Sequence, residues 1–71
     1  MDAADIPLDV QALAAWKAAV DYRASVERHE HLATQRKWNE DLLPAERRHA
    51  DELDAVAATM RRLAAHAKAR T

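Results

Sequence analysis

Glycine is absent from all 71 residues of the chain, and this absence argues against folds built from sheets. Tight hairpins and bulges depend on residues with positive φ, a conformation that glycine adopts at little cost. Phenylalanine is also absent and isoleucine occurs once, although strands are rich in aromatic and β-branched residues. Eighteen residues are alanine, the strongest helix former. The composition therefore predicts an all-α protein.

Cysteine is absent as well, which excludes disulfides, iron–sulfur clusters and thiolate zinc sites. No apolar run approaches the roughly 20 residues that a membrane span needs. The first residues include Asp2, Asp5 and Asp9, where an export signal needs basic side chains. We therefore expect a cytoplasmic protein with no membrane partner. Arginine outnumbers lysine eight to three, which with abundant alanine is typical of a GC-rich genome and favours a bacterial or phage origin.

Two prolines indicate where helices begin. Pro7, flanked by acidic residues, fits a first helix over about 8–40. Pro44 lacks the amide that a helix interior needs and fits the first turn of a second helix over about 44–69, after a turn at about 41–43. The prediction is an antiparallel two-helix hairpin forming a single domain over 1–71. One continuous helix kinked at Pro44 stays as the alternative, because no glycine marks the turn.

Apolar residues of both helices recur in alternating steps of three and four, the spacing of a coiled-coil seam. In the second helix this series runs from Leu42 to Ala67, and in the first from Leu13 to Trp38. Folding the chain back on itself brings the two series together. We therefore expect a core seam formed by Leu13, Trp16, Val20, Trp38, Leu53, Val56, Met60 and Leu63.

A second stripe lies on the opposite side of the first helix and consists of Ala15, Ala18, Tyr22, Val26, His29 and Ala33. A two-helix hairpin covers only one side of this helix, so a stripe with Tyr22 and Val26 on it implies a further helix. We expect this stripe to be an interface, either of a homodimer that forms a four-helix bundle or with a larger protein partner. A domain this small buries only about 60% of its unfolded surface and needs such support.

Polar residues interrupt the seams near the predicted turn. Glu46 and His49 form a Glu-x-x-His pair, the spacing that builds di-iron sites in four-helix bundles when two copies combine with further glutamates. A dimer could thus bind iron, manganese or zinc through Glu27, Glu30, His31, Glu46 and His49. The competing interpretation is a polar layer that fixes the helix register without metal. The register favours the polar layer, because Glu30 lies about one turn too far from Glu46.

Enzymatic signatures are missing from the sequence. No nucleophile stands beside a base, and no phosphate-binding loop can form without glycine, so we expect neither catalysis nor a cofactor. The acid-free tail carries Arg61, Arg62, Lys68 and Arg70, which leaves nucleic-acid binding as a weaker hypothesis without aromatic stacking residues to support it. The sequence therefore predicts a small non-catalytic interaction or regulatory module, with the metal-binding bundle and the nucleic-acid-binding hairpin as alternatives.

Overall fold

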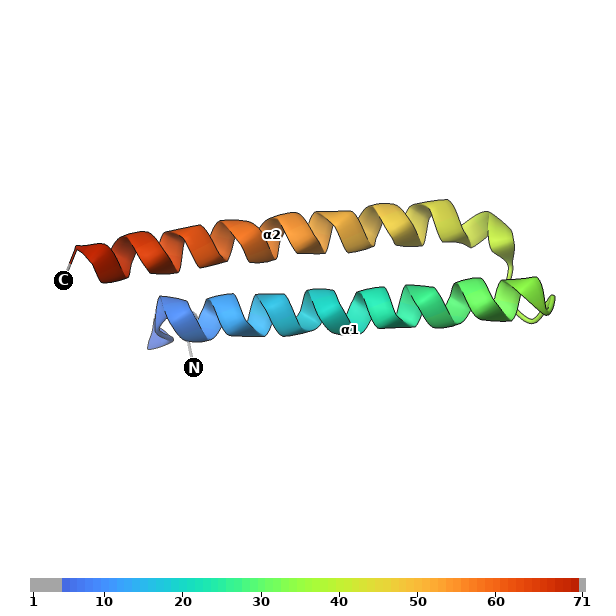
Figure 1. The fold of residues 1–71 in the computed structure, drawn as a ribbon, viewed down its shortest axis with the longest axis horizontal. Coiled ribbons are helices and arrows are strands. Elements are labelled where there is room, and N and C mark those ends of the chain that lie inside the picture. The colour runs from blue at the N-terminus through green and yellow to red at the C-terminus, as the bar shows by residue number, and fades with distance from the viewer. Residues whose placement is uncertain (1–4, 71) are drawn as a thin grey trace.

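The computed structural model describes residues 5–70, and over this range the chain folds into two long helices lying side by side (Figure 1). Helix α1 spans Leu8–Thr34, the short 3-10 helix η2 spans Glu40–Leu42, and helix α2 spans Leu43–Ala69. The two long helices run in opposite directions and pack against each other. The predicted all-α antiparallel hairpin is therefore confirmed, and a single kinked helix is excluded.

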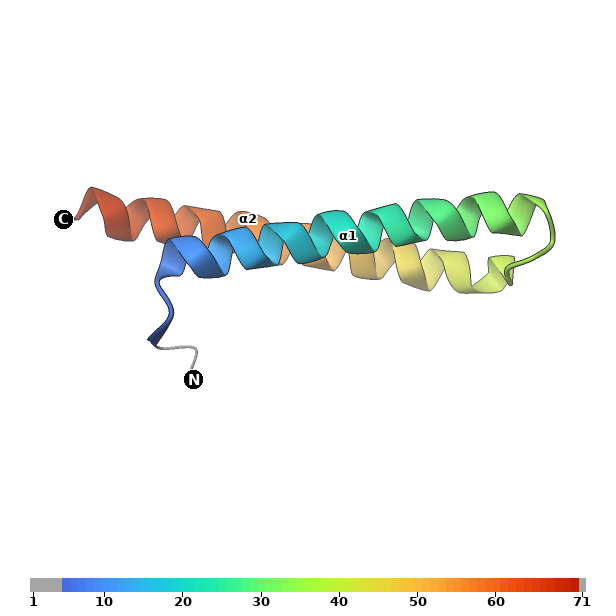
Figure 2. The same cartoon turned by 90° about the horizontal axis from the view of Figure 1, so that it is seen from below.

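The hairpin is an elongated single layer. Its principal extents are 53 × 23 × 14 Å, so its thickness is about that of one helix. The radius of gyration is 15.7 Å, against about 11 Å expected for a compact domain of this length. Figure 2 shows the helices crossing at a shallow angle, and within residues 5–70 no further helix covers either side of the pair. Both long helices are therefore open to solvent, or to a partner, on two sides of their common contact line.

Helix α2 begins as its sequence predicts. Pro44 lies in the first turn, where a missing amide costs nothing, and Glu46 places a negative charge near the helix N-terminus. The helix ends at Ala69 with His66 and Lys68 in its last turn, where positive charge is favourable. The predicted bounds of about 44–69 are thus confirmed.

Helix α1 ends at Thr34, so the prediction that it continues to about residue 40 was wrong. Arg36 adopts a positive φ of 59°, and the amides of Arg36 and Lys37 donate to the carbonyls of Ala33 and Leu32 at 3.0 and 2.8 Å. This is the Schellman pattern that closes helices, usually with glycine at the left-handed position. An arginine here conceals the helix end from sequence analysis. The turn predicted at about 41–43 is instead a connection of residues 35–42.

The core of the hairpin is small and built largely from alanine. Its buried hydrophobic residues are Ala19, Val26, Leu43, Ala50 and Ala57. Within each helix these residues are spaced by seven, which is two helical turns, so they form one line along each contact surface. Alanine side chains let the helix backbones approach closely but bury little apolar area. The hairpin is therefore tightly packed along one line and has little hydrophobic stabilisation of its own.

Candidate functional site

The stripe predicted as a partner interface lies mostly inside the hairpin. Val26 is only 3% exposed, and the Tyr22 ring packs edge-on against the His49 ring of α2 with centroids 4.8 Å apart. Ala15, His29 and Ala33 are half-buried along the same line, and only Ala18 is exposed. The assignment of Ala15, Tyr22, Val26, His29 and Ala33 to an outer interface was therefore wrong, because these residues face α2. Ala18 is the one member of the predicted stripe that lies on the outside.

The series predicted to form the core of α1 lies outside the hairpin. Leu13 is 63% exposed and Trp16 48% exposed, and Val20 is similarly accessible. The prediction placed large apolar side chains in the core, but the helices approach through alanines, which exclude large side chains from the contact line. Leu13, Trp16 and Val20 are therefore corrected from core residues to surface residues, and Trp38 is half-buried at the turn instead.

The predicted seam of α2 divides into two rows. Leu53 and Met60 are half-buried beside the contact line, while Val56 and Leu63 are exposed. Val56 and Leu63 each precede a contact-line position, Ala57 and Ala64, by one residue, which turns them about 100° around the helix. The seam of α2 is thus a real apolar stripe, but one row of it points away from α1.

A polar cluster of His29, Trp38 and Glu46, here called the turn cluster, joins the connecting residues 35–42 to both helices. The ring nitrogen Nδ1 of His29 donates to Oε2 of Glu46 at 2.7 Å, and the indole N–H of Trp38 donates to Oε1 at 3.1 Å. The rings of His29 and Trp38 stack 3.6 Å apart. Both Glu46 oxygens thus have partners inside the hairpin. The sequence indicated a polar layer here but assigned His29 to the interface stripe and Trp38 to the core seam, because the early end of α1 was hidden.

The predicted metal ligands do not meet within one hairpin. Glu46 is held by the turn cluster, Glu30 pairs with Arg47 at 3.2 Å, and His31 lies 3.2 Å from the Gln35 amide. His49 packs on Tyr22, and Glu27 is exposed. Across residues 5–70, no three His, Asp or Glu side chains gather closely enough to hold a metal ion. The Glu-x-x-His spacing is used here for a hydrogen bond and a ring contact.

On one side of the contact line, the hairpin presents what we call the uncharged face. In both helices it consists of the residues just before each contact-line position, and these positions hold no Asp, Glu, Lys or Arg. They are Gln11, Ala18, Ser25 and Leu32 in α1, and Leu42, His49, Val56 and Leu63 in α2. The half-buried side chains of Leu53 and Met60 border this row. The uncharged face therefore runs along nearly the whole hairpin, and its exposed apolar side chains are Leu42, Val56 and Leu63 of α2.

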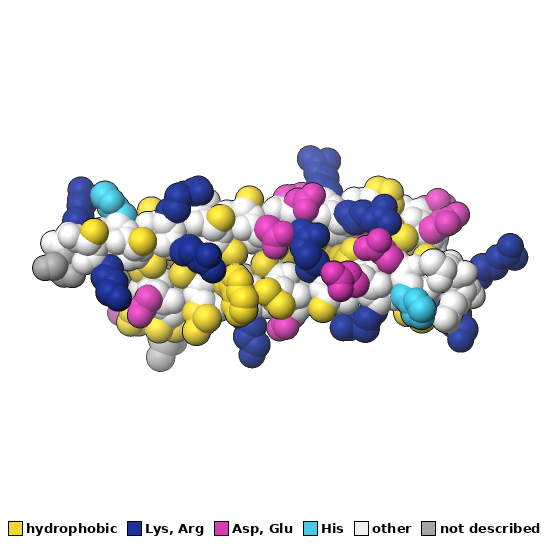
Figure 3. All heavy atoms as spheres, viewed as in Figure 1, with side chains coloured by type: hydrophobic (Ala, Val, Ile, Leu, Met, Phe, Trp, Pro, Cys, Tyr) yellow, Lys and Arg dark blue, Asp and Glu magenta, His cyan; other side chains and the backbone are white. Residues whose placement is uncertain are grey.

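On the opposite side lies the charged face, formed by the residues three before or four after a contact-line position: Asp9, Trp16, Arg23 and Glu30 in α1, and Arg47, Asp54, Arg61 and Lys68 in α2. Arg23 donates to Asp51 at 2.9 Å and to Asp54, and these hydrogen bonds raise the pKa of its guanidinium. Figure 3 shows charged side chains gathered between the helices toward the turn and hydrophobic ones toward the open end, where the two termini lie. The two sides of the hairpin thus differ in chemistry.

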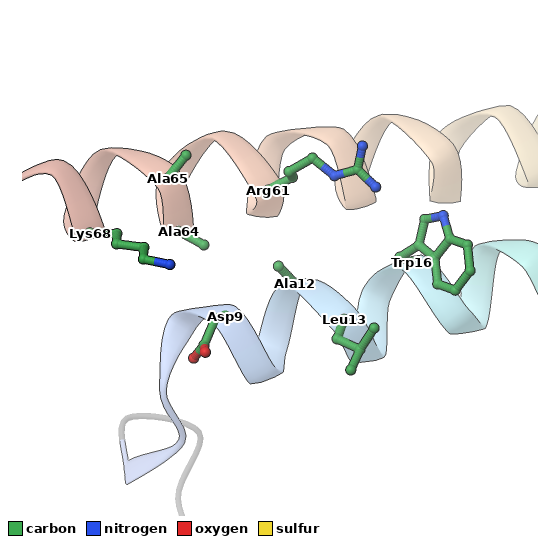
Figure 4. Close-up of a pocket in the computed structure, with 8 residues that line it drawn as sticks. All are labelled: Asp9, Ala12, Leu13, Trp16, Arg61, Ala64, Ala65 and Lys68. Carbon is green, nitrogen blue, oxygen red and sulfur yellow. The ribbon is translucent and has the colours of Figure 1, made fainter.

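A groove opens between the helices at the open end of the charged face. It is lined by Asp9, Ala12, Leu13, Trp16, Arg61, Ala64, Ala65 and Lys68 (Figure 4). Arg61 and Lys68 stand on the same row of α2, whereas Arg62 reaches Thr59 at 3.2 Å on another side of that helix. The bases of the tail that suggested nucleic-acid binding are therefore divided between two surfaces.

Comparisons of this chain with protein-family models, with curated proteins and with solved structures found no match. Within residues 5–70, neither long helix carries an apolar stretch that could cross a bilayer.

Proposed function

We propose that this protein is a non-catalytic protein–protein interaction module that acts as a homodimer, in which two hairpins pack their uncharged faces together as a four-helix bundle. The observation that carries the proposal is the uncharged face itself. Val56, Leu63 and Leu42 are each about half exposed there, in a row without charge. A contiguous exposed apolar surface bordered by polar residues is characteristic of an association site. In a four-helix bundle, each helix buries two apolar positions per heptad and one flanking row of residues in the core. The apolar residues of α2 follow this pattern.

The accessible surface of the chain supports the same proposal. It amounts to 5687 Å², whereas a compact monomer of 8.0 kDa has about 4,500 Å². The surplus is about 1,200 Å² per chain. If a dimer hides that surplus on both copies, it buries about 2,400 Å² in total, which is in the range of obligate dimers. The area that the hairpin leaves open thus matches what a stable dimer needs.

Three exposed valines allow a matched test. Val56 lies on the uncharged face, Val20 on the opposite side near Trp16, and Val10 on the outer side of α1, with exposed fractions of 53, 46 and 49%. Each is changed to Glu, and mass is measured by light scattering across micromolar concentrations. We expect the unmodified protein and V10E to be dimers, and V56E to associate at least about 100-fold more weakly, because a lone charge in an interface costs about 3–5 kcal/mol.

The valine series also defines what would overturn the proposal. A cooperatively folding monomer at all concentrations would exclude the homodimer. Loss of the dimer in V20E, with V56E unaffected, would move the interface to the charged face. If V56E unfolds instead, its circular dichroism should show helix returning as the protein concentration is raised to the point at which V56E dimers form. The reason is that the hairpin depends on its partner.

A further inference from the structure

We propose that the two hairpins of the dimer lie with their connections at the same end, so that α1 of each copy packs on α2 of the other. This inference rests on the proposed dimer through the uncharged face and deepens it, because it states how the second copy is oriented. Two-fold symmetry allows two ways of joining these faces. Either the connections share one end of the bundle, or the connection of each copy covers the open end of the other.

A cross-helix ion pair shows which residues stand at the same level along the hairpin. Arg23 of α1 donates to Asp51 of α2 at 2.9 Å, so these two residues are level. Ser25 lies two residues beyond Arg23, and His49 lies two residues before Asp51 on the antiparallel helix, so they are level as well. Both rows of the uncharged face repeat every seven residues. The level pairs are therefore Leu32 with Leu42, Ser25 with His49, Ala18 with Val56, and Gln11 with Leu63.

Side-chain size distinguishes the two orientations. In the middle of the uncharged face, α1 presents Ala18 and Ser25, whereas α2 presents the larger His49 and Val56 at the same levels. With the connections at one end, Val56 packs on the partner's Ala18, and His49 packs on the partner's Ser25. Large side chains then face small ones, which lets the two layers interdigitate at the density of a protein interior.

The opposite orientation places each helix on its own copy. Helix α1 then faces α1 with small residues on small ones, and α2 faces α2 with large residues on large ones. Each hairpin is a single layer 14 Å thick, so one separation between the layers must serve both pairs of helices. A separation that accommodates Val56 and His49 leaves a void between the two α1 helices, and such cavities are unfavourable. The size pattern therefore favours connections at the same end.

The residues between the contact line and the uncharged face give a second, independent reason. In each copy Tyr22 is level with Leu53 and, one repeat toward the turn, His29 is level with Glu46. With the connections together, the two His29–Glu46 pairs meet in one polar layer. With the connections apart, each pair would face the apolar residues around Ala67 at the open end of the other copy. An ion pair enclosed by apolar side chains is costly, so this pattern also favours the connections together.

The absence of cysteine allows a direct test, because one introduced cysteine places one spin label on each copy. The labels are placed at Lys37 on the connection, at Ala69 near the open end and at Ala55 midway along α2, all of which are exposed. Pulsed electron paramagnetic resonance then measures the distance between the two labels of a dimer. We expect less than about 35 Å for Lys37→Cys and for Ala69→Cys, because neighbouring helix axes lie about 10 Å apart. The opposite orientation would separate each pair by about 45 Å or more along the 53 Å hairpin.

Ala55→Cys is the matched control, because a label in the middle of the hairpin gives a similar short distance in either orientation. A short distance for Ala55→Cys with long distances for Lys37→Cys and Ala69→Cys would overturn the orientation and leave the dimer standing. A monomeric mass by light scattering, with no dipolar signal from Ala55→Cys, would overturn both proposals.

The packing of Val56 on the partner's Ala18 is tested separately by a double-variant cycle. Ala18→Leu should weaken association at least tenfold through overpacking, and Val56→Ala should weaken it by leaving a void. Combined in one chain, the two changes again place a large side chain on a small one. The double variant should therefore associate at least tenfold more tightly than the product of the two single effects gives. Single effects that simply multiply would contradict this contact between the copies.

Discussion

The two ends of the hairpin are stabilised in different ways. At the turn end, the turn cluster joins the connection to both helices, Leu43 is buried, and cross-helix pairs such as Glu30 with Arg47 flank the contact. At the open end, the helices meet through alanines, and Leu13, Trp16 and Leu63 face outward. The turn end pairs its polar groups within one chain, although Leu42 is 48% exposed there. The open end leaves more apolar surface exposed, so we expect recognition there while the turn end maintains the fold.

The two tryptophans offer the largest test of this comparison. Trp38→Ala removes a ring stack and an indole hydrogen bond from the half-buried turn cluster, and we expect it to lower the free energy of unfolding by about 3 kcal/mol. Trp16→Ala removes a largely exposed ring and should cost about 1 kcal/mol or less. Urea titrations followed by circular dichroism at one protein concentration measure both. Equal losses would show that the two ends contribute alike.

Alanine substitutions test packing at the two ends with a smaller expected effect. Ala50 is fully enclosed between the helices, so Ala50→Leu should destabilise the hairpin by about 2 kcal/mol through overpacking. Ala64 lies beside the open groove and is half-buried, so Ala64→Leu should change stability by less than about 0.5 kcal/mol. Thermal melting at matched concentration reports the difference. If Ala64→Leu were as damaging as Ala50→Leu, the open end would be as closely packed as the turn half.

The smallest expected effect concerns the end of α1. Arg36 holds a positive φ that costs a non-glycine residue about 1–2 kcal/mol, so Arg36→Gly should stabilise the hairpin by about 1 kcal/mol after the added freedom of the unfolded chain is counted. Gln35→Gly is the matched control, because Gln35 has a φ of −96° and gains nothing from glycine. A stabilisation by Gln35→Gly equal to that by Arg36→Gly would contradict the proposed strain.

Sequence reasoning could predict the elements of this fold but not which sides of them meet. Absent glycine, abundant alanine and Pro44 were sufficient for two antiparallel helices and for the bounds of α2. The facing sides were misassigned because side-chain size was taken as the guide to burial. In this hairpin, close approach selects small residues such as Ala19 and Ala57, and the larger Trp16 is displaced outward.

The polar residues near the turn show the same limit of sequence reasoning. Glu46 was correctly singled out as a group that needs a partner, and it has two. Those partners, His29 and Trp38, could not be identified, because Trp38 reaches Glu46 only after the chain leaves α1 at Thr34 and bends back. Arg36 conceals this bend, because nothing in the sequence indicates that this arginine adopts a positive φ.

The alanine contact line also determines how the chain responds to heat. Alanine has no side-chain rotamers to fix, so the contact line forms with little loss of side-chain entropy. It also exposes little apolar area when it opens, and exposed apolar area is the main source of the heat-capacity increase on unfolding. The hairpin by itself therefore has a shallow stability curve and a broad melting transition. A partner that covers the outward-facing leucines, valines and Trp16 would increase the heat-capacity change of unfolding, so that change, measured by calorimetry, reports how much of this surface is occupied.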